Sequence, residues 1–291
     1  MHNDDRPRRS VLYMPGSNPR ALAKGRELPA DGLILDLEDA VAPDAKESAR
    51  EHVREALADK SAYGRREIVV RTNGLDTEWG RGDLLSMAKA GADAILLPKV
   101  DNAAMVDEAA AVLDEAGAPA NLPIWCMMET PRGILHAEEI ADHPAVTCLV
   151  LGTSDLTKDM RALHTAMRLP MLLSLGQCLL AARAAGIAVL DGVHLDLADL
   201  EGHAASCTQG RELGFDGKTL IHPKQIEAAN TAFAPSAEDV AWSARIIEAW
   251  EEASAKGKGV VLVDGKLVEN LHIAEARRLL ALSAAIEEMK A

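Results

Sequence analysis

Two acidic residues, Glu129 and Asp155, each follow a short apolar run of the sequence. Glu129 comes after Pro-Ile-Trp-Cys-Met-Met, and Asp155 comes after Cys-Leu-Val-Leu-Gly-Thr-Ser. Both runs are typical of buried strands, and a carboxylate at the end of such a strand is costly unless a cation or hydrogen bonds meet it. Two carboxylates from neighbouring strand ends are suitable ligands for a hard divalent cation. We therefore predict that these two residues bind Mg²⁺.

Charged residues also follow other apolar runs. Asp36, Glu38 and Asp39 lie at the end of one run, Arg71 ends the next, and Lys99 follows the one after that. The three acids either cap a following helix or pair with bases, and we expect at least one of them to support the site. We predict that Lys99 is an ion-pair partner rather than a Schiff-base nucleophile. A nucleophilic lysine needs a lowered pKa, and acids crowd the same region.

Arg71 has two interpretations. It closes the apolar run Ile68-Val-Val, which is a poor place for a solvated charge. Its planar guanidinium suits a substrate carboxylate or an oxygen on which negative charge develops. Structural ion pairing with Asp36 or Glu38 is the alternative.

The stretch Pro15-Gly-Ser-Asn-Pro-Arg20-Ala-Leu-Ala-Lys24 predicts a loop that opens a helix at Pro19. Free backbone N–H groups at such a helix start can bind an anion. Arg20 and Lys24 would lie one turn apart on the same face. Together they could hold the phosphates of a nucleotide-like ligand, and the alternative is an ordinary capped helix with solvated bases.

These residues depend for their positions on an alternation of short apolar runs and helical patterns between Val11 and Phe233. The alternation predicts parallel strands joined by helical crossovers, and about eight such units fit a closed (β/α)₈ TIM barrel. A doubly wound open sheet is the alternative, but no G-x-G-x-x-G follows the first run. The candidate strands are Val11–Met14, Gly32–Leu37, Glu67–Arg71, Ala94–Leu97, Pro123–Met128, Cys148–Leu151, Ala188–Leu190 and Gly217–Leu220. In a barrel their carboxyl ends would share one mouth, where active sites form.

The pattern changes after Phe233. A long acidic helix pattern leads to a hairpin with Asp264-Gly265 at its turn, and a last amphipathic helix follows. We predict a barrel domain over residues 1–233 and a C-terminal lid segment over residues 234–291, which packs on the barrel or on a neighbouring subunit.

The composition limits the possible partners and compartment. The chain has 291 residues, 48% of them hydrophobic, and a formal net charge of -14. This charge argues against nucleic acid or an anionic membrane as the main partner. No apolar run approaches the ~18 residues of a membrane span, and the N-terminus lacks a signal-peptide pattern. The four cysteines form no C-x-x-C pair, so we expect free thiols and a cytoplasmic protein.

Several motifs together resemble one enzyme family, the CoA-ester lyases of the citrate lyase β-subunit type within the HpcH/HpaI aldolase/citrate lyase superfamily. This family includes malyl-CoA lyase and citramalyl-CoA lyase. The matching motifs run in the expected order from Ser10 onwards: Ser10-Val-Leu-Tyr-Met-Pro-Gly-Ser-Asn-Pro-Arg20, Leu35-Asp-Leu-Glu-Asp-Ala-Val-Ala-Pro43, Val70-Arg-Thr-Asn-Gly74, Leu97-Pro-Lys99, Met128-Glu-Thr-Pro131, Gly152-Thr-Ser-Asp155-Leu and Gly217-Lys-Thr-Leu-Ile-His-Pro-Lys-Gln-Ile226.

The resemblance implies a TIM barrel with a C-terminal lid in a homotrimer or hexamer. It implies Mg²⁺ on Glu129 and Asp155, and substrate contacts at Arg71, Glu129 and Gly152. It also places Arg20 and Lys24 where family members hold the phosphates of CoA.

The resemblance further implies that an acid from a neighbouring subunit's lid transfers a proton. In the family this acid ends a D-G-x-M-I-D motif, whereas the chain reads Asp264-Gly-Lys-Leu-Val-Glu269. A carboxylate is kept but is one methylene longer. If Glu269 does not reach the acyl α-carbon, activity could shift toward thioester hydrolysis.

The activity that the resemblance implies is reversible carbon–carbon cleavage of a 3-hydroxyacyl-CoA. Citramalyl-CoA would give pyruvate and malyl-CoA would give glyoxylate, each with acetyl-CoA or a homologue. Two alternatives are a malyl-CoA thioesterase that uses the same metal site, and a citrate lyase β subunit that acts on a citryl-acyl carrier protein. A metal aldolase for phosphoenolpyruvate-type substrates is a weaker alternative, since it would not need the Arg20 and Lys24 loop.

Overall fold

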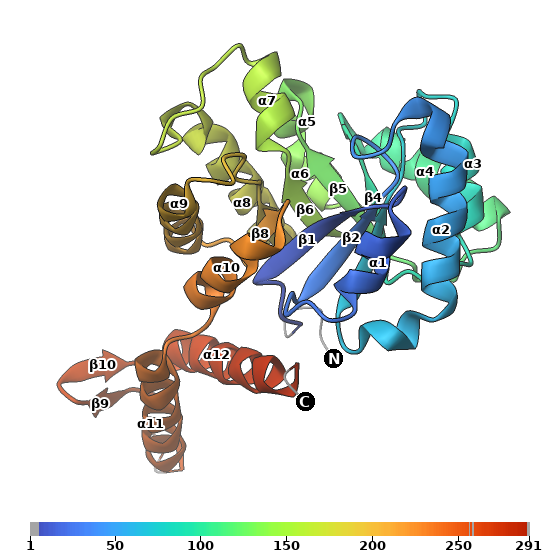
Figure 1. Ribbon diagram of the computed structural model, residues 1–291. Coiled ribbons are helices and arrows are strands. Elements are labelled where there is room, and N and C mark those ends of the chain that lie inside the picture. The colour runs from blue at the N-terminus through green and yellow to red at the C-terminus, as the bar shows by residue number, and fades with distance from the viewer. Residues whose placement is uncertain (1–5, 256, 258, 290–291) are drawn as a thin grey trace. The chain divides into compact units, whose positions relative to one another are not determined.

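The structure is a computed structural model, and it describes residues 6–255, 257 and 259–289. The chain divides into two compact units, with residues 8–233 in one and the segment from Ala234 onwards in the other. The first unit is a closed barrel of parallel strands with helices outside it (Figure 1). Its strands are β1 Ser10–Pro15, β2 Gly32–Asp36, β3 Glu67–Arg71, β4 Ala94–Leu97, β5 Ile124–Met128, β6 Val146–Leu151, β7 Ala188–Asp191 and β8 Gly217–Leu220.

The crossovers between these strands are helical. They comprise α1 Pro19–Gly25, α2 Lys46–Ala58, α3 Gly80–Met87, α4 Ala103–Glu115, α5 Pro131–Leu135, α6 Ala137–Ala141, α7 Thr153–Asp159, α8 Leu172–Ala185 and α9 Leu200–Leu213, with α10 Ile226–Phe233 after the last strand. Short 3₁₀ turns lie at Pro43–Ala45, Lys60–Tyr63, Leu169–Met171 and Pro223–Gln225.

The barrel is closed by parallel pairing of β1 with β8, in which Ser10 lies opposite Lys218 and Leu12 opposite Leu220. This pairing confirms the predicted (β/α)₈ fold and excludes the open sheet. It also brings the carboxyl ends of all eight strands to one mouth, as predicted.

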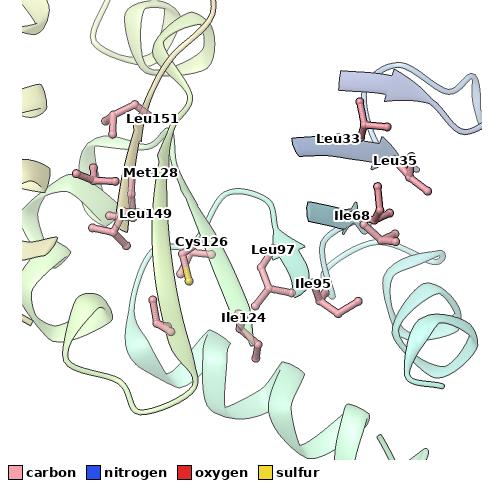
Figure 2. Close-up of a cluster of buried hydrophobic side chains, with 14 of the residues drawn as sticks. Leu33, Leu35, Ile68, Ile95, Leu97, Ile124, Cys126, Met128, Leu149 and Leu151 are labelled. Carbon is pink, nitrogen blue, oxygen red and sulfur yellow. The ribbon is translucent and has the colours of Figure 1, made fainter. Parts of the chain in front are cut away.

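The core has two layers because side chains alternate along each strand. Figure 2 shows the outer layer, where Leu33, Leu35, Ile95, Leu97 and their neighbours point toward the helices. The residues between them fill the barrel interior, and these are Val11, Ile34, Val69, Ala94, Leu96, Trp125, Met127, Cys148, Val150 and Leu190. Both faces are apolar, which explains why the strands read as continuous apolar runs.

Ion pairs close the end of the barrel opposite the mouth. Arg8 binds Glu67 with its Nε 2.6 Å from the carboxylate, and its guanidinium lies 5.4 Å from the ring centre of Trp125. Arg9 binds Asp31 at 2.8 Å. The paired charges at this end serve stability, which leaves the mouth for chemistry.

The second unit contains α11 Ala237–Ser254, strands β9 Val261–Val263 and β10 Lys266–Val268, and α12 Asn270–Glu288. The predicted hairpin is present, and both turn residues have positive φ, 49° at Asp264 and 76° at Gly265. Asp-Gly favours such a turn because glycine adopts positive φ without steric cost. The unit has its own apolar cluster, formed by Ile246, Val268, Ile273 and Ala276. Among the described residues, no helix is both long enough and apolar enough to cross a bilayer.

Candidate metal and substrate site

Glu129 is the buried acid at the barrel mouth. It directly follows β5 and is 2% exposed. Its Oε1 accepts a hydrogen bond from the backbone N–H of Lys99 at 2.8 Å. Burial raises the pKa of Glu129 to about 7, and the negative charge of Glu38 adds to this effect, although Lys99 and Arg71 oppose it. The carboxylate is therefore short of positive charge, which a bound cation would supply.

Lys99 contacts two acids at the mouth, Glu129 through its backbone N–H and Glu38 through its side chain. Its φ of +48° places it in the left-handed region, which is uncommon for a residue with a side chain. In that conformation its N–H points at Glu129 while its Nζ pairs with Glu38. Burial acts to lower the pKa of Lys99, but the hydrogen bond and charge of Glu38 outweigh it, and the pKa is raised. The structure thus confirms the predicted ion pair, and a raised pKa does not suit a Schiff-base nucleophile.

Arg71 is an ion-pair residue in this structure. Its Nε and Nη2 each lie 2.7 Å from one carboxylate oxygen of Asp36, so the two groups bind in a bidentate fashion. Its Nη1 is 2.8 Å from Oε2 of Glu38, and the guanidinium lies over the ring of Tyr13 at 4.8 Å. The structure therefore shows the ion pairing of Arg71 with Asp36 and Glu38, which was the alternative to substrate binding. The bidentate edge of Arg71 faces Asp36 and its Nη1 faces Glu38, so a substrate oxygen would have to share the guanidinium with these two acids.

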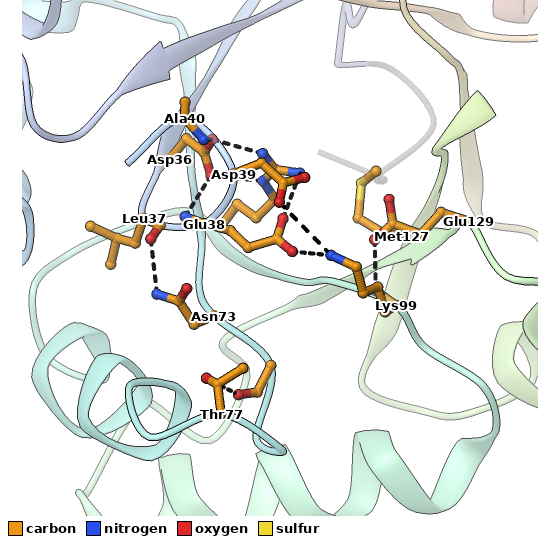
Figure 3. Close-up of polar contacts among 12 residues, drawn as sticks. Asp36, Leu37, Glu38, Asp39, Ala40, Asn73, Thr77, Lys99, Met127 and Glu129 are labelled. Atoms are coloured by element: carbon orange, nitrogen blue, oxygen red, sulfur yellow. Dashed lines mark hydrogen bonds and ion pairs between the residues drawn. The ribbon is translucent and has the colours of Figure 1, made fainter. Parts of the chain in front are cut away.

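Asp36, the last residue of β2, fixes the loop that follows this strand (Figure 3). Asp36 accepts backbone hydrogen bonds from Glu38 at 2.9 Å and from Ala40 at 3.1 Å. Glu38 is buried, whereas the side chain of Asp39 is 59% exposed and lies 3.8 Å from Arg71. Asp36 and Glu38 therefore fix the loop and the arginine, and Asp39 contributes only a distant charge.

Gly152 lies beside Glu129 at the end of the adjacent strand. The N–H of Gly152 donates to the carbonyl of Met128 at 3.1 Å, which continues the pairing of β5 with β6. A Cβ at this position would lie 2.3 Å from the Cβ of Glu129 and 2.4 Å from its Oε2. Only glycine leaves the Glu129 carboxylate in its observed place.

Asp155 lies in the first turn of α7, three residues after Gly152. It is partly exposed. Its side chain has no hydrogen bond or ion pair among the described residues. The register of β5 and β6 brings α7 to the same mouth as Glu129. Asp155 therefore offers an unpaired carboxylate there.

The donor set fits Mg²⁺ better than zinc. In the described part of the chain, no three His, Cys, Asp or Glu side chains are placed to hold one metal ion. A structural zinc site would need four such ligands, or three at a catalytic site. Mg²⁺ in contrast keeps several waters and is usually bound by one or two carboxylates together with substrate oxygens. The buried Glu129, together with Asp155, which has no partner among the described residues, matches this ligand preference.

The predicted CoA-binding residues lie on α1. The helix begins at Pro19 as expected, and the side chain of Asn18 caps it by accepting from the N–H of Ala21 at 3.1 Å. Arg20 and Lys24 are both exposed, and Lys24 pairs with the exposed Glu27 at 2.7 Å. Such an exposed pair contributes only ~0–1 kcal/mol. Lys24 is therefore available to an anionic ligand.

Glu269 belongs to the second unit and lies at the start of α12. It is partly exposed, and its backbone N–H donates to Nδ1 of His272 at 3.1 Å. The barrel residues and Glu269 are thus in separate units of the chain. Its part in proton transfer stays a prediction.

Two features of the mouth were missed from the sequence. Tyr13 faces the barrel interior, and its hydroxyl lies 3.3 Å from the sulfur of Met127. The second feature is the pairing of Asp191, a strand-end acid that is fully buried and bound by Lys218 and Arg168 at 2.7 Å each. Burial acts to raise the pKa of Asp191, but these two cations lower it. Asp191 is a structural ion-pair partner and not an open acid.

The chain is similar to known proteins along its length. A family model described as HpcH/HpaI aldolase/citrate lyase matches residues 9–223. A (3S)-malyl-CoA thioesterase of Cereibacter sphaeroides (strain KD131 / KCTC 12085) is 51% identical over 291 residues and is covered over 100% of both chains. A citrate lyase subunit beta of Leuconostoc mesenteroides subsp. cremoris is 38% identical over 289 residues, which cover 97% of this chain and 95% of that protein.

A solved structure of the protein CitE from Mycobacterium tuberculosis, in complex with magnesium, acetoacetate and coenzyme A, is also similar. Its TM-score is 0.75 at 30% identity, with 94% of this chain and 97% of that chain covered. These findings confirm the family that the motifs indicated and its enzymatic character. The names of the relatives divide between thioester hydrolysis and carbon–carbon cleavage.

Proposed function

The chain belongs to the HpcH/HpaI aldolase/citrate lyase family, and we propose that it hydrolyses a CoA thioester of the malyl-CoA type in a Mg²⁺-dependent reaction. The observation that carries this proposal is the 51% identity to (3S)-malyl-CoA thioesterases along the entire length of both chains. The citrate lyase β relatives are less similar, at 38% or below. The sequence motifs alone favoured carbon–carbon cleavage and kept hydrolysis as an alternative. The higher identity to the thioesterases supports a proposal in which hydrolysis comes first.

Glu129 and Asp155 would hold the Mg²⁺. The bound ion would supply Lewis-acid chemistry, which withdraws electrons from substrate oxygens. Solved relatives bind magnesium together with small carboxylic acids such as acetoacetate and pyruvate, which supports this assignment. Lys99 would keep Glu129 in place through its backbone N–H, and Gly152 would leave the room that Glu129 needs.

Other side chains would bind the substrate and move the proton. Arg71 would stabilise negative charge that develops on the thioester oxygen, with its plane fixed by Asp36. Arg20 and Lys24 would bind the phosphates of CoA, and this remote binding energy would orient the reacting carbonyl. Glu269, from the lid of an adjacent subunit, would accept the proton of the attacking water.

Carbon–carbon cleavage is the second candidate function. It is favoured by the family and by the carboxylate that the chain retains at Glu269. In that reaction Glu269 would protonate the α-carbon of the departing enolate. Both malyl-CoA and citramalyl-CoA are candidate substrates, since their acyl groups differ by one methyl group. A pocket discriminates one methyl group by only ~1–3 kcal/mol.

Product analysis tests the proposal. The purified protein is incubated with (3S)-malyl-CoA and Mg²⁺, and free CoA, malate, glyoxylate and acetyl-CoA are quantified. We expect equal amounts of free CoA and malate without glyoxylate. Glyoxylate and acetyl-CoA in equal amounts would instead establish the lyase. Citramalyl-CoA as a parallel substrate measures the acyl preference, and a purified complex with α and carrier-protein subunits would support a citrate lyase component.

The family resemblance also supports a cytoplasmic homo-oligomer, a trimer or a hexamer, whose lids reach neighbouring subunits. A variant pair separates this arrangement from a self-contained chain. We expect Glu129→Gln and Glu269→Gln each to be inactive alone, and mixing them to restore part of the activity only if sites form between subunits. No recovery in mixed oligomers would place Glu269 in the same chain's site or outside it.

A further inference from the structure

Tyr13 forms part of the floor of the barrel mouth. It is one of the residues of β1 that point into the barrel, and it packs against the inner core cluster. Val11, the next inward residue below it, is fully buried, whereas Tyr13 is partly exposed. Because the interior beneath it is filled, the exposed part of Tyr13 faces the mouth. The guanidinium of Arg71 lies over its ring at 4.8 Å.

The hydroxyl of Tyr13 is directed across the barrel toward β5. It lies 3.3 Å from Sδ of Met127. The position that a Cβ of Gly152 would occupy is 3.0 Å from Cε of the same methionine and 2.4 Å from Oε2 of Glu129. Met127 therefore links the hydroxyl of Tyr13 to the part of the mouth where the Glu129 carboxylate lies.

The hydroxyl of Tyr13 is a donor with a weak acceptor. Among the described residues, its hydrogen bond is made to a thioether sulfur, and such a sulfur is a weak acceptor. Burial raises the pKa of Tyr13 above its ordinary value, although the guanidinium of Arg71 opposes this effect. The phenol therefore stays protonated at neutral pH and keeps its O–H. A carboxylate oxygen would be a better acceptor than the sulfur, because a hydrogen bond to an ionised group is the stronger one.

The two cations beside Glu129 are already paired with acids of the chain. Arg71 binds Asp36 and Glu38. Lys99 pairs with Glu38 as well. A substrate carboxylate that drew Arg71 or Lys99 away would leave a buried acid short of a partner, which is costly. The neutral O–H of Tyr13 can bind an anion without this cost, since it releases only a sulfur atom.

The proposed orientation of the substrate brings its acyl end to this floor. Arg20 and Lys24, which would bind the phosphates of CoA, are exposed on α1, outside the barrel. The acyl group is the opposite end of the thioester and would reach inward to Glu129. We propose that the hydroxyl of Tyr13 donates a hydrogen bond to the terminal carboxylate of the acyl group, and so selects CoA thioesters that carry one. The inference rests on the substrate class of the proposed function, but it holds for hydrolysis and for carbon–carbon cleavage alike.

Calorimetry with (S)-malate in saturating Mg²⁺ tests the contact. Malate offers the same hydroxyl and carboxylate as the malyl group, and it undergoes neither reaction. Tyr13→Phe removes only the hydroxyl. Tyr63→Phe is the matched control, because it changes the other tyrosine of the chain, whose hydroxyl donates to the carbonyl of Leu22 at 3.0 Å in the outer layer of the core.

We expect Tyr13→Phe to raise the dissociation constant of (S)-malate by about 10–100-fold and to keep the Mg²⁺ affinity of wild type. Tyr63→Phe should bind malate as wild type does. Wild-type malate affinity in Tyr13→Phe would overturn the proposal. A parallel loss of Mg²⁺ affinity would overturn it as well, because the hydroxyl would then support the metal site and not the substrate. A wild type that binds no malate would contradict the substrate class itself.

A second ligand identifies the oxygen that Tyr13 contacts. (R)-3-hydroxybutyrate has the arrangement of (S)-malate around its hydroxyl carbon, but it carries a methyl group in place of the carboxylate attached there. We expect the preference for malate over (R)-3-hydroxybutyrate, measured as the ratio of their dissociation constants, to fall by about 10–100-fold in Tyr13→Phe. An unchanged preference would overturn the contact with the carboxylate. Neither ligand reacts, so these results are independent of the product analysis that decides between hydrolysis and cleavage.

Met127→Leu shows whether the hydroxyl of Tyr13 acts directly or by holding the methionine. This variant removes the sulfur but keeps an apolar side chain of similar size. We expect it to lose less malate affinity than Tyr13→Phe does. An equal loss in the two variants would overturn the direct contact with the substrate, because the hydroxyl would then act only through Met127.

Discussion

Neutralising Glu129 should make the metal-free protein more stable while it destroys the metal site. Burial raises the pKa of Glu129 from an ordinary 4.5 to about 7. A carboxyl group with a raised pKa in the folded state contributes stability below its unfolded pKa, and this stability is lost as pH rises through the folded pKa. This shift in the pKa of Glu129 lowers the free energy of unfolding by about 3 kcal/mol above pH 7.

Glu129→Gln removes this cost, because the amide is neutral and can still accept the N–H of Lys99. We expect its free energy of unfolding in urea with EDTA to exceed that of wild type by about 3 kcal/mol at pH 8 and by under about 1 kcal/mol at pH 5. Glu55→Gln, on the exposed face of α2, should stay within about 0.5 kcal/mol of wild type at both pH values.

Magnesium should reverse the comparison. At 100 times its dissociation constant, Mg²⁺ should stabilise wild type by about 2.7 kcal/mol and leave Glu129→Gln unaffected. The reasoning would be refuted if Glu129→Gln were less stable than wild type at pH 8 in EDTA. A difference from wild type that is the same at pH 5 and pH 8 would also refute it.

Three further predictions concern the same acid and its neighbours. Gly152→Ala should weaken Mg²⁺ binding and turnover by about 10–100-fold, because its Cβ would displace the Glu129 carboxylate. Gly259→Ala, whose Cβ meets no atom within 4 Å, is the control for calorimetry. Equal Mg²⁺ affinity in both variants would contradict the role of Gly152 in positioning Glu129. Lys99→Gly should keep the left-handed turn and the N–H that binds Glu129, but it loses the ammonium group that pairs with Glu38. Its Mg²⁺ affinity should therefore fall less than that of Lys99→Val, in which a β-branched residue must adopt positive φ. The reverse order of affinities would show that the ammonium group matters more than the backbone conformation. Mg²⁺ affinity should fall by about tenfold for each pH unit below 7 as protons compete for Glu129, and a flat titration between pH 5.5 and 7 would exclude it as a ligand.

The fold could be predicted because its signals are local. Eight apolar runs separated by helical patterns require parallel pairing, and parallel strands that close on each other place Glu129, Asp155, Arg71 and Lys99 at one mouth. Apolar alternation and capping residues such as Asn18 depend only on near neighbours in the sequence. They can therefore be recognised without knowledge of the rest of the fold.

The partners of the charged side chains could not be predicted in the same way. Asp191 is neutralised by Arg168 and Lys218, which lie 23 and 27 residues away. The fork of Arg71 has Asp36 as its partner, and only the direction of the side chains decides between this acid and a substrate. Long-range pairings of this kind are set by the closed barrel and leave no trace in the spacing of either residue.

The left-handed conformation of Lys99 is another feature without a sequence signal. Positive φ is expected at glycine or asparagine, and here it occurs at a lysine after a proline. The surrounding contacts to Glu129 and Glu38 compensate for this conformation. Such backbone strain often marks a functional position.

Isothermal titration of Mg²⁺ tests most directly whether Glu129 and Asp155 share one cation. Wild type, Glu129→Gln, Asp155→Asn and Asp159→Asn are compared, the last as a control that removes an exposed acid from the same helix. We expect one Mg²⁺ per chain in wild type and Asp159→Asn, and no binding in the other two. Wild-type Mg²⁺ affinity in either Glu129→Gln or Asp155→Asn would contradict the shared metal site.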